Sequence, residues 1–158
     1  MKKLSVKQMY YILWVTIMDQ SQNALTVMHN AEELLNRLEK NQFYGEMGYE
    51  QINHCFNTLP KLHRFPNKMA RNIYNSIITI KCVFDGDVSK VFSGDEKNII
   101  MNLLKFDGIS YHKANLCTYI LKCIENRELC SGEIRKKCNC NITDEILFKE
   151  LTIIENLL

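Results

Sequence analysis

The residues that make tight turns are scarce in this chain. Its 158 residues include six glycines and two prolines, whereas average usage would give about 11 and about 8. An all-β protein needs such residues at most of its strand connections, so the shortage argues against that class. Apolar residues instead recur at three- and four-residue spacing, which is typical of helices. We therefore predict an all-α fold of seven or eight helices, in one compact domain over residues 1–158.

Apolar spacing and capping residues predict where the helices lie. Apolar positions are nearly continuous from Val6 to Met18, which predicts a first helix buried on most of its sides, and its longest almost uncharged run is Met9 to Met18. A helix capped by Asn67 should end before Asp85, and Thr143 should cap the last helix. A further helix should begin near Asp95 and bury the stripe Ile99, Ile100, Leu103 and Leu104. Other helices are expected over about 23–40, 49–58 and 111–125, while residues 127–141 should be irregular.

Cysteine usage and hydropathy bear on location. The apolar run of the first helix is half the roughly 20 residues that a bilayer requires, and no small-residue cleavage site follows Lys2 and Lys3. We therefore expect neither a membrane span nor a signal peptide. The seven cysteines are an odd number, which favours free thiols and a reducing compartment, the cytoplasm or the nucleus. Three of them lie on apolar helix faces and are expected in the core: Cys55, Cys82 and Cys117.

Positive charge is concentrated in the middle of the chain. Residues 61–90 contain six Lys or Arg against two Asp, and residues 97–137 contain eight against four acids. The formal net charge of the whole chain is only +2. Such a local surplus suits an anionic partner, although a solvated helix face would give the same pattern.

The segment Phe106-Asp107-Gly108-Ile109-Ser110-Tyr111-His112-Lys113-Ala114 predicts a hairpin between two helices. Gly108 permits a positive φ, and the first amides of the following helix have no intrahelical partner. Together with the positive end of the helix dipole they form a seat for a phosphate, to which Lys113 adds a charge. A hairpin of this kind would hold a nucleic-acid backbone without reading bases. An ordinary helix cap explains the same residues equally well.

This helix-hairpin-helix, at about 97–123, resembles the element found in the HhH-GPD superfamily of endonuclease III-like DNA glycosylases. Three more stretches resemble the small uncharacterised HhH-GPD-type proteins of bacteria, in the same order along residues 12–123. They are Ile17-Met18-Asp19-Gln20, Leu62-His63-Arg64-Phe65-Pro66 with Met69-Ala70, and Phe84-Asp85-Gly86-Asp87. The resemblance implies a two-lobed helical fold, a monomer, and base-excision repair on double-stranded DNA.

The resemblance also implies DNA-binding residues. A glutamine in the superfamily fills the gap left by an extruded base, and Gln20 stands at the matching position. The hairpin would supply Gly108, Ser110, Tyr111, His112 and Lys113. Bifunctional members of the superfamily use a lysine as nucleophile, and His112 stands at the position of that lysine here. Because Lys113 is rotated from that position by about 100° on a helix, we expect no Schiff-base lyase activity.

The superfamily's catalytic Val-Asp segment is absent, and the carboxylates in range are Glu128, Glu133 and Asp144. We take Asp144 as the candidate catalytic residue, with a helix-dipole acid as its alternative. The predicted function is a monofunctional DNA N-glycosylase or a diverged relative. The alternatives are a non-catalytic helix-hairpin-helix repair-accessory module and a helical protein-interaction domain.

Four cysteines near the C-terminus raise the question of a metal. Gaps of six, seven and one residues separate Cys123, Cys130, Cys138 and Cys140. Only the first gap fits the iron-sulfur cluster loop of the superfamily. We therefore expect neither a metal nor another cofactor, while zinc held by Cys130, Cys138 and Cys140 stays as an alternative.

Overall fold

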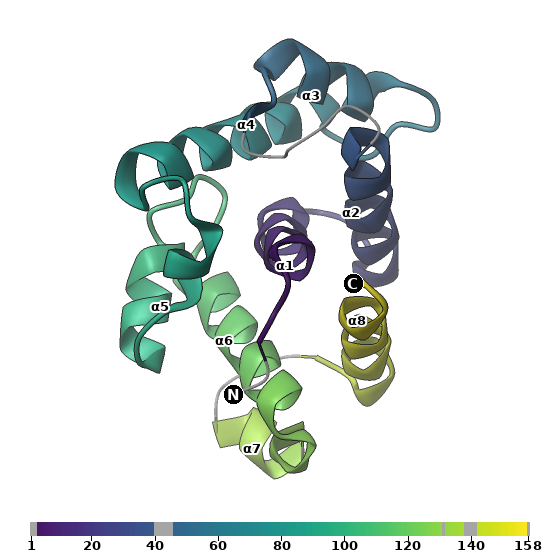
Figure 1. Ribbon diagram of the computed structural model, residues 1–158. Helices are drawn as coiled ribbons and strands as arrows, with labels where there is room; N and C mark the ends of the chain where they lie inside the picture. The colour runs from purple at the N-terminus through teal and green to yellow at the C-terminus, as the bar shows by residue number, and fades with distance from the viewer. Residues whose placement is uncertain (1–2, 40–45, 131, 138–141, 158) are drawn as a thin grey trace.

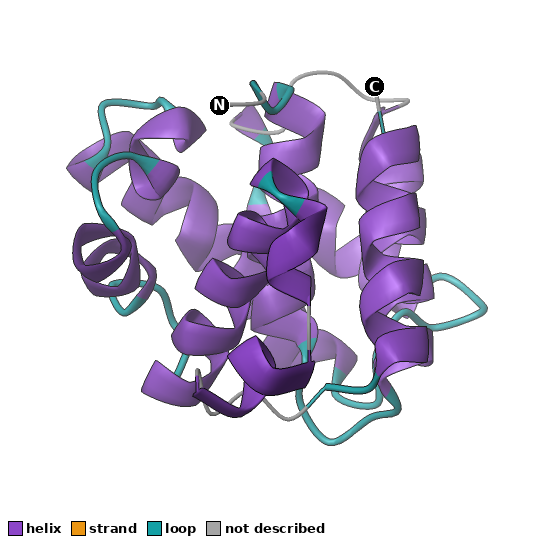
Figure 2. Cartoon of the chain, turned by 90° about the horizontal axis from the view of Figure 1, so that it is seen from below, coloured by secondary structure: helices purple, strands orange, loops and turns teal. Residues whose placement is uncertain are grey.

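The computed structural model describes residues 3–39, 46–130, 132–137 and 142–157. Within these ranges all of the regular secondary structure is helical and there is no strand, which confirms the all-α prediction (Figure 2). None of the described helices is both long and apolar enough to cross a membrane. The α-helices are α1 (Val6–Met18), α2 (Ala24–Glu39), α3 (Tyr49–Asn57), α4 (Pro66–Val83), α5 (Glu96–Leu103), α6 (Tyr111–Glu125), α7 (Gly132–Lys137) and α8 (Asp144–Asn156), and the short 3₁₀ helices are η2 (Val88–Phe92) and η3 (Arg127–Cys130).

Helix α1 lies at the centre of the molecule. Figure 1 shows it surrounded by α2, α4, α6 and α8, and each of these helices contacts it. Tyr11, Leu13 and Trp14 have no exposed surface. The indole Nε1 of Trp14 donates a hydrogen bond of 3.0 Å to Ser76 Oγ on α4, so its polar atom is satisfied inside the core. The nearly continuous apolar run of this segment thus reflects burial on every side.

The start of α1 is fixed by reciprocal hydrogen bonds. Ser5 Oγ accepts from the Gln8 amide at 3.1 Å, and Gln8 Oε1 accepts from the Ser5 amide at 2.8 Å. This is a capping box, which satisfies two of the amides that a helix start leaves free. The Gln8 side chain also donates to Ile154 O at 2.7 Å. The first turn of α1 is thereby tied to the end of α8.

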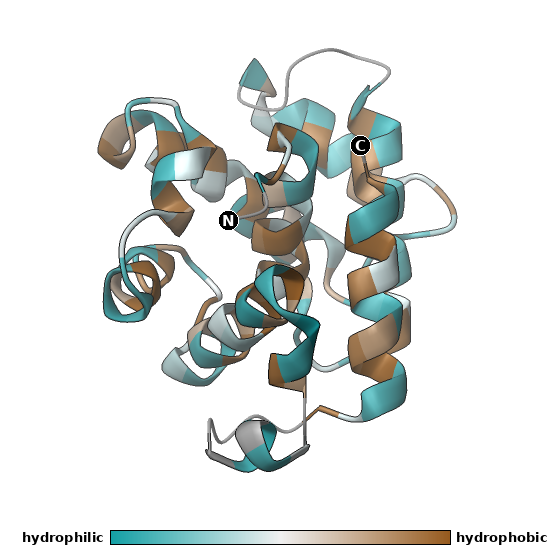
Figure 3. Cartoon of the chain, turned by 60° about the horizontal axis from the view of Figure 1, so that its bottom comes forward, coloured by the Kyte–Doolittle hydropathy of each residue, from teal (hydrophilic) through white to brown (hydrophobic). Residues whose placement is uncertain are grey.

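The outer helices are amphipathic. Figure 3 shows hydrophobic and hydrophilic residues alternating around the helix that leads to the C-terminus, which is α8. Its buried apolar residues are Leu147, Leu151 and Ile154, spaced by four and three residues. That spacing places them on one face, which packs on the core.

Two predicted boundaries are wrong. Helix α4 begins at Pro66 with Phe65 as N-cap, so Asn67 is not its cap. Proline is favoured at the first helical position because its fixed φ suits a helix and its missing N–H is not needed there. The segment 127–141, expected to be irregular, contains η3 and α7 among its described residues.

Two predictions of burial are also wrong. In the stripe expected on α5 only Leu103 is buried, and Leu104 is 42% exposed because the helix ends at Leu103 and its periodicity stops there. Cys82 is exposed near the end of α4, whereas Cys55 and Cys117 lie in the core as predicted. Residues near a helix end can point past the packed face, which spacing alone does not reveal.

Arg37 joins α2 to the end of α3. Its Nη1 donates to Cys55 O at 2.6 Å and to Thr58 O at 3.0 Å, and its Nη2 donates to Pro60 O at 3.0 Å. Its Nε also donates to Glu33 Oε1 at 3.1 Å. The planar guanidinium therefore satisfies carbonyls that α3 and the following connection leave without helical partners.

We predict that Arg37→Lys lowers the free energy of unfolding by about 1–2 kcal/mol, because one ammonium cannot reach all these carbonyls. Urea denaturation monitored by circular dichroism would measure it. The matched control is Arg127→Lys, at an exposed ion pair with Glu155, where the change should stay within about 0.5 kcal/mol. Equal losses for the two variants would contradict the bridging role.

Candidate functional site

A tight hairpin joins α5 to α6. Its apolar anchors, Phe106 and Ile109, are buried, and Gly108 between them has a φ of +88°. A Cβ atom at Gly108 would lie 3.1 Å from Asn72 Nδ2 and 3.6 Å from the carbonyl oxygen of Ile17. Glycine is therefore favoured at this position both by the backbone conformation and by the close approach of α4 and α1.

Helix α6 starts directly after this bend. Ser110 is the N-cap, and its Oγ accepts from the Lys113 amide at 3.3 Å. The amides of Tyr111 and His112 form no hydrogen bond with the described residues, and both side chains are exposed. These predicted residues are thus brought together at one exposed helix start.

Lys113 folds back from α6 over the hairpin. Its Nζ donates to Gly108 O at 2.8 Å and to Ile17 O at 3.4 Å. Burial lowers the pKa of this ammonium, and the negative charge of Asp19 opposes that shift. The lysine therefore holds the hairpin against the C-terminal end of α1, a position that helical rotation alone did not predict.

His63 fixes the loop before α4 to the same end of α1. Its Nε2 lies 2.9 Å from Met18 O, and its Nδ1 accepts from the Phe65 amide at 3.0 Å. Nδ1 is therefore unprotonated and Nε2 carries the hydrogen, which is the neutral form. Burial lowers the pKa of His63 in agreement with this arrangement. Gln20, the residue predicted to enter DNA, follows α1 here and is half-buried.

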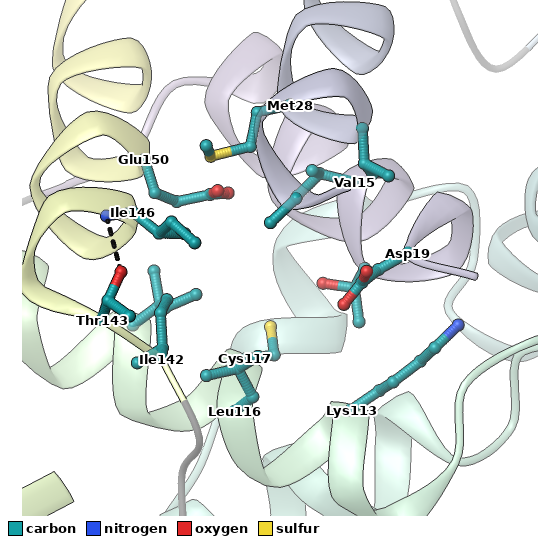
Figure 4. Close-up of a pocket in the computed structure, with 14 residues that line it drawn as sticks. Val15, Asp19, Met28, Lys113, Leu116, Cys117, Ile142, Thr143, Ile146 and Glu150 are labelled. Carbon is teal, nitrogen blue, oxygen red and sulfur yellow. Dashed lines mark hydrogen bonds between the residues drawn. The ribbon is translucent and has the colours of Figure 1, made fainter. Parts of the chain in front are cut away.

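A cavity of about 340 Å³ lies between α1, α2, α6 and α8 (Figure 4). This volume lies within the range of pockets that accept small organic molecules, about 300–1,000 Å³. Asp19 and Lys113 border it, and Glu150 points into it from α8. The remaining lining is mostly apolar: Val15, Thr16, Ala24, Val27, Met28, Leu116, Cys117, Ile120, Ile142, Thr143 and Ile146.

Glu150 is a buried acid at the wall of this cavity. Glu150 is only 5% exposed. Among the described residues, no Lys, Arg or His side chain forms an ion pair with it. Burial raises the pKa of this carboxyl group to about 8, with a further contribution from the charge of Asp19. Because the charged form is costly in an apolar site, the group carries a proton at neutral pH.

Asp144, the predicted catalytic residue, has a different environment. Its side chain is 70% exposed and forms an ion pair with Arg135. Arg135 also donates to Ile142 O at 2.8 Å and to Cys130 O at 3.2 Å. The lining of the cavity includes the neighbouring Thr143 and not Asp144. In this position the carboxylate orients an arginine that ties the start of α8 to η3.

The described residues contain no cluster of three or more His, Cys, Asp or Glu side chains suited to a metal. Cys123 and Cys130 are buried free thiols, and burial raises the pKa of Cys123 to about 12. Cys138 and Cys140, the other residues of the alternative zinc site, lie outside the described residues.

Fold and site together define a class: an all-α protein in which a helix-hairpin-helix with a positive-φ glycine borders a cavity that holds a buried acid. Comparison of the chain with known protein families, with curated proteins and with solved structures finds no match. The geometry of the hairpin and the cavity therefore carries the functional conclusion.

The raised pKa of Glu150 predicts how stability depends on pH. The folded protein holds this proton up to about pH 8, whereas an unfolded chain releases it near its ordinary value of about 4.3. Its contribution is therefore complete below about pH 4 and is lost as the pH rises towards 8. Relative to Glu150→Gln, the protein should lose up to about 1.4 kcal/mol of unfolding free energy per pH unit across this window.

Urea denaturation of both proteins at pH 5, 6, 7 and 8 would measure this slope. The control is Glu145→Gln, the same substitution at an exposed position of α8. It gives the pH dependence of the unfolding free energy that this substitution causes at the surface. A stability difference between the protein and Glu150→Gln that stays constant over this range would contradict a protonated Glu150.

Proposed function

We propose that this chain is a DNA-binding protein of the base-excision-repair type, which holds a sugar-phosphate backbone at the Gly108 hairpin. The observation that carries the proposal is the exposed start of α6, where the amides of Tyr111 and His112 form no hydrogen bond with the described residues. Free amides at the positive end of a helix dipole commonly bind phosphate. We call this exposed start of α6, with the amides of Tyr111 and His112, the backbone seat.

Charges around the hairpin support the same partner. Lys68 and Lys113 both lie close enough to His63 to oppose its protonation, and Arg64 and Lys105 are exposed on adjacent segments. Basic side chains near a backbone seat displace counterions from DNA and supply most of its non-specific affinity. Contacts to phosphate alone do not read the base sequence.

The cavity would add a second binding site, for a base, beside the backbone seat. Enzymes and binding proteins that act on one base take it out of the stack into a pocket. The cavity borders the hairpin through Lys113 and has room for a small organic ring. We therefore propose double-stranded DNA as the partner, with one extruded base as the occupant of the cavity. Free buried thiols suit a reducing compartment, so the cytoplasm or the nucleus is the proposed location.

The backbone seat predicts a charge-dependent loss of binding in His112→Glu. An acid in the first turn favours the helix and repels phosphate, so the variant should fold normally and bind a duplex about tenfold more weakly at low salt, with a shallower salt dependence. Fluorescence anisotropy with a labelled duplex at several salt concentrations would measure both effects.

The matched control is Lys97→Glu, at the equivalent second position of α5. This substitution changes the net charge by more than His112→Glu does, but it lies at the opposite end of α5 from the hairpin. We expect nearly unchanged binding. If Lys97→Glu weakens binding more than His112→Glu, total charge rather than the hairpin governs affinity, and binding that is insensitive to salt would sink the proposal.

Two functions are open to such a protein. Removal of a base requires a carboxylate beside the cationic sugar that forms when the glycosidic bond breaks. Asp19 borders the cavity, whereas Asp144 is paired with Arg135 outside it. We propose Asp19 as the carboxylate placed to serve this step. The pairing of Asp144 is the observation that favours the second candidate, a DNA-binding module without glycosylase activity.

The two carboxylates predict different results in a glycosylase assay. Duplexes with alkylated, deaminated or oxidised bases would be incubated with the protein and heated in alkali to break the strand at sites without a base. If cleavage occurs, we expect Asp19→Asn to lower its rate at least about a hundredfold and Asp144→Asn to retain most of it. The reverse order would restore Asp144 as the catalytic residue, and uniform inactivity would favour the non-catalytic module.

A further inference from the structure

The cavity between α1, α2, α6 and α8 contains a polar group that the binding of a DNA backbone does not use. The carboxyl group of Glu150 points into it among the side chains of Val15, Met28 and Ile146 (Figure 4). Most of the surrounding surface is apolar. A buried polar group in such a place costs free energy unless a partner forms hydrogen bonds with it.

The groups around Glu150 leave it without a strong partner. No cation among the described residues forms an ion pair with it, and the ammonium of Lys113 is engaged by the carbonyls of Gly108 and Ile17. The Tyr11 hydroxyl lies nearby but forms no hydrogen bond of normal geometry. The titratable side chains that lie around this carboxyl are Tyr11 on α1, Asp19 directly after α1, and Lys113 and Cys117 on α6.

One of these neighbours, Asp19, is an acid, and its negative charge disfavours a second negative charge on Glu150. A protonated carboxyl presents one O–H donor and one C=O acceptor side by side. Its complement is a flat edge on which an acceptor stands beside an N–H donor. Rings of this kind also suit apolar walls, because their faces bury without leaving polar atoms unpaired.

We propose that Glu150 selects the occupant of this cavity, and that the occupant is an uncharged heteroaromatic base whose edge carries an acceptor next to an N–H donor. The base can be free or can belong to a nucleotide extruded from DNA, and the second source rests on the proposed function. Because the lining is mostly apolar, the sugar and phosphate of such a nucleotide would stay at the mouth of the cavity. Glu150 is thus a specificity-determining residue at a distance from the backbone seat.

Binding of N-methylated bases tests this inference, because the methyl group stands where the sugar would be attached. Calorimetric titration would use 9-methyladenine and 1-methylcytosine, with 1-methylindole as a flat ring that lacks the donor and acceptor pair. We expect the two bases to bind at pH 6.5 at least tenfold more tightly than 1-methylindole. Their affinity should fall at least fivefold at pH 9, where Glu150 loses its proton.

Two substitutions separate hydrogen bonding from shape. In Glu150→Gln the amide keeps a donor beside an acceptor, so we expect base binding at pH 6.5 with the dependence on pH removed. In Glu150→Met a flexible apolar chain of similar length replaces the acid, so the preference for bases over 1-methylindole should disappear. Circular dichroism would establish that both variants are folded. Bases that do not bind, or that bind Glu150→Met as well as the unsubstituted protein, would overturn the inference.

A parallel measurement on the unsubstituted protein identifies the source of the base. A duplex with one mismatched base should bind more tightly than a fully paired duplex if the base enters from DNA, and this preference should be lost in Glu150→Met. Glu150-dependent binding of free bases without such a preference would identify a free base as the ligand and support the inference in that form. Failure of the proposed binding of the DNA backbone would be recognised by a different result, namely an affinity for duplex DNA that does not depend on the salt concentration.

Discussion

The carbonyl end of α1 is the point on which the rest of the site depends. A helix buried on all sides still leaves its last carbonyls without helical partners, and inside a core these groups need donors. Lys113 reaches Ile17 O from α6, and His63 reaches Met18 O from the loop before α4. Elements far apart in the sequence therefore meet at this end, and the hairpin, the loop 62–65 and the border of the cavity are all positioned around it.

The fold follows closely from the sequence where local signals are strong. The bounds of α1 and α6 and the Thr143 cap of α8 agree with the predictions, because apolar periodicity and capping residues are local properties. The errors concern helix ends. Pro66 begins α4 because proline suits the first position of a helix, a local signal that competes with the capping preference of Asn67. Leu104 is exposed because α5 ends one residue earlier.

The site was only partly accessible from the sequence. The hairpin was predicted from Gly108 and the helix start that follows it, both of which are local features. The cavity was not predicted, because it is formed by four helices whose relative placement no spacing encodes. One signal for Glu150 was nevertheless present: it lies at position 150 between Leu147, Leu151 and Ile154, so it shares their buried face. An acid on an apolar helix face is unusual, since its burial opposes its charge.

The hairpin and the cavity are joined through a single side chain. Lys113 lines the cavity, while its ammonium binds Gly108 O at the bend and Ile17 O at the end of α1. A phosphate at the start of α6 would attract this ammonium, and any movement of it away from those carbonyls would alter the border of the cavity beside Asp19. Under the proposed function, binding of a strand at the start of α6 and access to the cavity would therefore be coupled through Lys113.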